Sequence, residues 1–189
     1  MKIALCNGKG GSGKTTVAVL LASALGEAGH DVALLDTDPQ KTATRWIGET
    51  QSPIILAQNG KKYGALLIDT PPRLESRQVA EAISSADAVI VVSSPSPADL
   101  FTSRDTVELI NKNQAIERSR LLFNQVQPGT ILARELKDMA DRIGLQPLKS
   151  QLHRRQAYQH AVVLGWKSLP LEAREEIFKL ALEITSLAK

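Results

Sequence analysis

The apolar residues of this chain fall into short uninterrupted blocks, separated by longer stretches of mixed polarity. A short apolar block without period-2 alternation is typical of a strand that is buried on both faces of a parallel sheet. The mixed stretches are long enough to form amphipathic helices. The pattern predicts strands over 2–7, 31–36, 65–69, 87–93, 119–124 and 145–149, with an edge strand around 54–57.

Helices are expected between these strands. Gly29 follows the first of them, where a helix often ends on a left-handed residue. The last helix has an apolar stripe for packing on the sheet and a polar side rich in glutamate, which an anionic membrane surface would repel. The expected helices cover 14–28, 40–48, 75–84, 98–112, 130–142, 155–164 and 170–187, and the stripe consists of Ile177, Leu180, Ala181, Ile184 and Leu187.

This alternation predicts an α/β fold, with a mostly parallel twisted sheet and helices on both faces. Ligands of such sheets bind at the carboxyl ends of the strands. The segment 50–64 is the least regular, and the chain has no obvious linker or internal repeat. We therefore expect residues 1–189 to form a single domain.

Composition narrows the protein class. Apolar residues make up 43% of the chain, which is ample for a core. No apolar run reaches the ~18 residues of a membrane-spanning helix, and the chain starts directly on a strand rather than on a signal peptide. Cys6 is the single cysteine, so it forms no internal disulfide and is expected to be buried and inert. These features predict a cytoplasmic protein.

A glycine-rich loop lies between the first expected strand and helix. Residues 8–16 match the pattern G-x-x-x-x-G-K-T, whose backbone N–H groups surround a polyphosphate at the N-terminus of the following helix. Lys14 can then reach the β- and γ-phosphates, and the Thr15 hydroxyl can coordinate Mg²⁺. The predicted nucleotide-binding residues of the loop are Gly8, Lys9, Gly10, Gly11, Ser12, Gly13, Lys14, Thr15 and Thr16.

The loop contains a second lysine that an ordinary phosphate loop does not need. Lys9 lies close to Lys14 in the string KGGSGKTT, and two fixed cations repel each other unless an anion offsets them. One interpretation is a solvated surface lysine. The other is a catalytic lysine that reaches the phosphates bound by a facing subunit, as an arginine finger does in other proteins.

The string KGGSGKTT resembles the deviant Walker A motif of the ParA/MinD family of dimeric ATPases. Residues 36–40 (DTDPQ) are similar to the second motif of that family, and 66–72 (LLIDTPP) to its Walker B segment. The DPQ ending favours the ParA branch. The resemblance implies a P-loop NTPase fold, ATP and Mg²⁺ as cofactors, and hydrolysis of ATP to ADP and phosphate.

The resemblance and the strand ends together assign roles to three aspartates. Asp38 is the candidate that positions the attacking water. The expected catalytic residues are Lys9, Lys14 and Asp38. Asp69 follows a buried strand and is expected to hold Mg²⁺ through water. Asp36 supports Mg²⁺ or Thr15 from farther away, or else caps a helix.

Asn124 ends the fifth strand and is a further candidate for nucleotide binding. Its amide can read the adenine edge with one donor and one acceptor, as asparagines at this point often do in ParA-like proteins. A turn residue is the competing interpretation. The run 94–100 resembles the family's loop that borders the dimer face, and a stiff proline-rich turn that caps the next helix is the alternative.

The charge distribution points towards nucleic acid. The net charge is only +3, but the stretch 149–167 contains no Asp or Glu. Small ParA-like ATPases have arginines in a comparable L-x-x-R-x-x-Y segment, which here ends at Tyr158. A solvated helix face is the alternative. The predicted DNA-binding residues are Lys149, Arg154, Arg155 and Lys167, and we expect binding to be independent of sequence.

The resemblance favours a ParA-type positioning ATPase. ATP would close a homodimer that holds nonspecific DNA on the nucleoid, and a ParB-like or cargo-adaptor protein would stimulate slow hydrolysis. The cargo could be a plasmid, a chromosomal locus or a protein body such as a carboxysome, as in McdA-like relatives. The main alternative is a metabolic enzyme of the dethiobiotin synthetase type. Iron–sulfur relatives need interface cysteines, and tyrosine-kinase relatives need a terminal tyrosine cluster, and neither is present.

Overall fold

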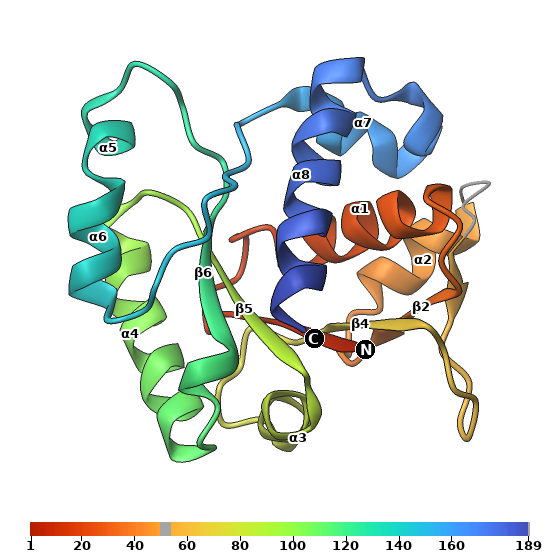
Figure 1. Ribbon diagram of the computed structural model, residues 1–189, viewed down its shortest axis with the longest axis horizontal. Helices are drawn as coiled ribbons and strands as arrows, with labels where there is room; N and C mark the ends of the chain where they lie inside the picture. The colour runs from red at the N-terminus through yellow and green to blue at the C-terminus, as the bar shows by residue number, and fades with distance from the viewer. Residues whose placement is uncertain (50–53, 189) are drawn as a thin grey trace.

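The computed structural model describes residues 1–49 and 54–188. The first part of the segment expected to be irregular, 50–53, lies outside these residues. Within the described chain, six parallel strands form one sheet in the order β3-β2-β4-β1-β5-β6 (Figure 1). The strands are β1 (Lys2–Cys6), β2 (Val32–Asp36), β3 (Ile55–Leu56), β4 (Ala65–Asp69), β5 (Ala88–Ser93) and β6 (Ser119–Phe123).

The expected strand at 145–149 is wrong. This segment forms only an isolated bridge between Pro147 and Leu121, although Leu148 donates its N–H to the Leu121 carbonyl at 2.8 Å. Proline has no N–H to extend a ladder, and the segment therefore follows β6 without becoming a strand. The edge strand expected around 54–57 is confirmed as β3.

Helices fill the intervals between the strands, as expected, with one difference. The helix predicted over 130–142 is divided at Glu135 into a short and a longer helix. The helices are α1 (Lys14–Glu27), α2 (Thr42–Glu49), α3 (Arg77–Ser85), α4 (Pro97–Lys112), α5 (Ile131–Arg134), α6 (Leu136–Ile143), α7 (Gln156–Leu164) and α8 (Leu171–Leu187).

The sheet is covered on both faces, which confirms the predicted layers (Figure 1). One core cluster joins the sheet to α1, α2, α7 and α8, and a second joins its other face to α3, α4 and α6. The apolar stripe of α8 is buried at Ile177, Leu180, Ala181 and Ile184, so this helix packs into the core as expected. Cys6 is fully buried in β1. No helix of the described residues is long and apolar enough to cross a membrane.

Candidate nucleotide-binding site

The glycine-rich loop runs from the end of β1 to the start of α1, at the carboxyl edge of the sheet. Gly11 and Gly13 have φ values of 81° and 93°, which L side chains rarely adopt. At Gly13 there is also no room, because an added Cβ would lie 2.2 Å from Nδ2 of Asn124. The loop needs glycine at this position for two independent reasons.

Asn124 and Gln125, at the end of β6, hold the loop in place. Asn124 is buried and donates from Nδ2 to the Ser12 carbonyl at 2.8 Å. Gln125 donates from Nε2 to the Gly11 carbonyl at 3.1 Å. Asn124 therefore supports the loop directly, and its contact with adenine stays a prediction. Sequence reasoning missed Gln125, although its place beside Asn124 at a strand end was a signal.

Lys14 is turned back onto its own loop. Its ammonium group donates to the Lys9 carbonyl at 2.9 Å, and the residue is only 6% exposed. Burial lowers the pKa of Lys14, and the negative charge of Asp69 counteracts part of that effect. A lysine held by one neutral carbonyl can move to an anion that enters the loop, because a charged acceptor binds an ammonium more strongly.

Asp69 is the acid that is best placed for a cation. It ends β4 in register with Asp36 of β2, and it is 1% exposed. Neither of its carboxylate oxygens has a hydrogen-bond partner among the described residues. Burial raises the pKa of Asp69 to about 7, and the Thr15 hydroxyl, which is nearby but forms no hydrogen bond of good geometry, offsets only part of that rise. A buried carboxylate without a hydrogen-bond partner fits Mg²⁺ with its bound water, because the cation supplies the missing positive charge and the water supplies the missing donors.

Asp36 and Asp38 have different surroundings from Asp69. The Oδ2 atom of Asp36 accepts from the Thr44 N–H at 2.9 Å and from its hydroxyl at 2.8 Å, which is the helix-capping alternative at α2. Its Oδ1 accepts from the Asp38 N–H at 3.1 Å. Asp38 is half-buried on the loop after β2, where one of its oxygens accepts from the Gln40 N–H at 2.9 Å. Asp36 is therefore already committed within the chain.

Lys9 forms an ion pair with Asp99, in the first turn of α4. The lysine side chain is 39% exposed and the aspartate side chain 1%. The second oxygen of Asp99 accepts from the N–H and the hydroxyl of Ser94, at 3.1 Å and 2.6 Å. Burial raises the pKa of Asp99, but the hydrogen bond from Lys9 and those from Ser94 outweigh burial and keep this pKa below its usual value. The sequence pattern indicated the loop 94–100 but not the partner of Lys9.

Acidic side chains of α8 contact the basic stretch 149–167, although the stretch itself contains none. Glu176 of α8 accepts hydrogen bonds from Arg155, from the Tyr158 hydroxyl at 2.8 Å and from His153 Nδ1 at 2.7 Å. Glu183 accepts from the backbone N–H of Lys149 at 2.7 Å. Of the four predicted DNA-binding cations, the structure therefore commits Arg155 to an acid that lies outside the stretch, while Lys149, Arg154 and Lys167 are exposed.

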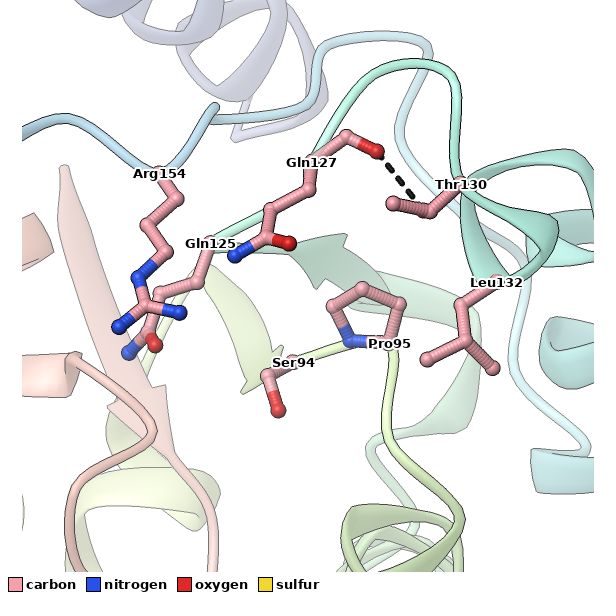
Figure 2. A pocket seen from close by; sticks show the side chains of 7 residues that line it. All are labelled: Ser94, Pro95, Gln125, Gln127, Thr130, Leu132 and Arg154. Carbon is pink, nitrogen blue, oxygen red and sulfur yellow. Dashed lines mark hydrogen bonds between the residues drawn. The ribbon is translucent and has the colours of Figure 1, made fainter.

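Two small cavities lie near the loop, and the loop itself lines one of them. One, of about 120 Å³, is bordered by Gly13, Thr16 and Asn124 on one side and by residues 153–155 and 158–159 on the other. The other, of about 210 Å³, contains Ser94 and Pro95 (Figure 2). Gln125 and Arg154 line both cavities, and their side chains lie next to each other in Figure 2. The structure thus brings the basic segment to the loop.

Comparisons with known proteins identify the family. A model of the CobQ/CobB/MinD/ParA nucleotide binding domain matches residues 3–165. The chain belongs to this family. It is 29% identical over 191 residues to the maintenance of carboxysome distribution protein A of Halothiobacillus neapolitanus, with 91% of this chain and 88% of that protein covered.

A further relative and a solved structure of the same fold are also similar to the chain. The family member ParA of Rhizobium radiobacter is 28% identical over 202 residues, with 96% of this chain and 90% of that protein covered. The fold is shared with the septum site-determining protein MinD of Pyrococcus horikoshii, solved with Mg-ADP, at a TM-score of 0.76 and 19% identity, with 99% of this chain and 96% of that chain covered. The resemblance to the ParA/MinD family is confirmed.

Proposed function

We propose that this chain is a ParA-type positioning ATPase that binds ATP with Mg²⁺ and closes a homodimer when ATP is bound. The observation that carries the proposal is the buried carboxylate of Asp69, which lacks a partner among the described residues beside a complete phosphate loop. Such a pair is an incomplete site, which a phosphate-bound cation would complete. The structure of the same fold that was solved with Mg-ADP supports the choice of ligand.

The residues of the loop divide the chemistry among them. Lys14 leaves the Lys9 carbonyl for the terminal phosphates, and the backbone N–H groups of 8–16 surround the rest of the polyphosphate. Thr15 and Asp69 would hold Mg²⁺, with Asp36 supporting the loop after β2. Bound Mg²⁺ supplies neutralisation of the phosphate charge. Asp38 orients the attacking water from that loop, and Lys9 contacts the nucleotide of the facing protomer.

Nonspecific DNA is the proposed partner of the closed dimer. Lys149, Arg154 and Lys167 are exposed and supply the contacts, while Arg155 supports their segment through Glu176. Dimerisation doubles the number of cations, so retention should fall steeply with salt. A ParB-like or cargo-adaptor protein stimulates hydrolysis and releases the dimer from the nucleoid. The named roles of the relatives in carboxysome distribution support a positioning role.

Sedimentation velocity tests the proposal. The wild-type chain should be monomeric alone and with ADP–Mg²⁺, and dimeric with a non-hydrolysable ATP analogue and Mg²⁺. Lys9→Ala should bind the analogue but stay monomeric, whereas Lys137→Ala, an exposed change on α6, should dimerise like the wild type. Dimerisation of Lys9→Ala at the wild-type midpoint would remove the role in the facing protomer.

A further inference from the structure

Both lysines of the phosphate loop are satisfied inside their own chain. Lys14 donates to the Lys9 carbonyl at 2.9 Å, the Lys9 N–H donates to the Asn7 side chain at 3.1 Å, and the Lys9 ammonium is paired with Asp99. Asp99 lies 90 residues away in the sequence, at the start of α4. The structure thus shows a closed arrangement of the loop in which Lys9 is engaged in cis.

The two ends of this pair are unequal. Asp99 is buried and anchored by both donors of Ser94, whereas more than a third of the Lys9 side chain is exposed. When Lys9 leaves, the carboxylate keeps its two bonds to Ser94 and water can take the place of the ammonium. The pair can therefore open without leaving Asp99 stripped of donors, which a fully buried ion pair would not permit.

We propose that Asp99 is a positioning residue that holds Lys9 in cis, and that Lys9 must leave Asp99 before it can reach a neighbouring protomer's nucleotide. The inference rests on the proposed function, because it needs an ATP-dependent dimer in which Lys9 acts on the facing protomer. Asp99 then competes with the facing phosphates for one ammonium group. The free energy needed to separate Lys9 from Asp99 is therefore subtracted from the free energy of ATP-driven dimerisation.

Ser94 makes the competition adjustable. Its hydroxyl donates to the oxygen of Asp99 that Lys9 does not use, and so it shares in neutralising the carboxylate. Removing this donor leaves Asp99 more dependent on Lys9, whereas removing the charge of Asp99 releases Lys9. Changes at Asp99 and Ser94 should consequently shift dimerisation in opposite directions, which general damage to the loop would not do.

The experiment combines amine labelling with sedimentation. In nucleotide-free protein, Lys9 of Asp99→Asn should react with an acetylating reagent roughly fivefold faster than wild type, since it loses a charge-assisted bond. With the ATP analogue and Mg²⁺, the dimer midpoint should fall about tenfold for Asp99→Asn and rise several-fold for Ser94→Ala. Asp105→Asn, an exposed change on the same helix, should match the wild type in both assays.

The outcomes separate the two proposals. If wild type does not dimerise with the analogue, the proposed function fails, and the labelling still tests the cis pair by itself. If wild type dimerises but Asp99→Asn leaves both labelling and midpoint unchanged, or weakens the dimer, the positioning role is overturned. Shifts of both variants in one direction also overturn it. Thermal melting shows that each variant is folded, and Ser94→Ala carries the test should Asp99→Asn not fold.

Discussion

Lys9 and Arg155 are two cations that the sequence assigns to phosphates, and in the structure each of them is paired with an acid from a distant segment. Lys9 of the phosphate loop offers one ammonium to Asp99. Arg155 offers two guanidinium donors to Glu176, which also accepts from His153 and Tyr158. The first pair has one contact and the second is the centre of a network.

The two cations differ in how easily each can leave its acid. A planar guanidinium with two donors in fixed geometry loses more on leaving than a single flexible ammonium does. Tyr158 is 5% exposed, so its hydroxyl also depends on Glu176 inside the protein. Arg155 therefore belongs to the architecture that fixes α7 against α8, and Lys9 belongs to the reversible part of the site.

The largest loss of folding stability is expected on substitution of Glu176, the centre of the network. Glu176→Ala removes the acceptor of three side chains and leaves their donors partly buried, which should lower the free energy of unfolding by about 3 kcal/mol. Glu175→Ala, an exposed neighbour on the same helix, should change it by less than about 0.5 kcal/mol. Urea denaturation compares the two, and equal losses would show that Glu176 is an ordinary surface residue.

Acid should weaken the same network. Burial raises the pKa of Glu176, but the hydrogen bonds from Arg155, His153 and Tyr158 outweigh burial and lower this pKa from 4.5 to about 2. A depressed pKa in the folded state gives stability that is complete above the unfolded value and lost as pH falls towards the folded one. We expect a loss of about 2 kcal/mol over that window, and Glu176→Gln should flatten this limb. A pH profile that the substitution leaves unchanged would contradict the expectation.

Neighbouring arginines should behave differently. Arg155→Ala leaves Glu176 without its main partner and should lower the free energy of unfolding by about 2 kcal/mol, whereas the exposed Arg154→Ala should lower it by less than about 0.5 kcal/mol.

For DNA binding the order of the two arginines should be reversed, which gel shifts at several salt concentrations can measure. Arg154→Ala should weaken ATP-dependent retention in a folded protein, with Lys137→Ala as the control. Indifference of the gel shift to Arg154→Ala would take this residue out of the DNA surface.

Contiguous motifs of the site could be predicted from the sequence, but contacts between distant segments could not. The phosphate loop and Asp69 lie on contiguous motifs beside buried strands, so local patterning was enough to place them at one edge of the sheet. The extent of 1–189 as one domain stays a prediction. Partners such as Asp99 and Glu176 are far from Lys9 and Arg155 along the chain, and only packing brings them together. An acid-free stretch of sequence therefore says little about the acids that face it, as Glu176 and Glu183 show.

The smallest stability effect is expected at Lys9, and it decides whether the two regions really differ. Lys9→Ala in nucleotide-free protein should lower the free energy of unfolding by only about 1 kcal/mol, because Ser94 still donates twice to Asp99. The double-mutant cycle with Asp99→Asn should give a coupling below that of Arg155→Ala with Glu176→Ala, measured by urea denaturation. A Lys9–Asp99 coupling as large as the other would mean that Lys9 is as fixed as Arg155, and a lysine fixed so firmly could not serve a facing protomer.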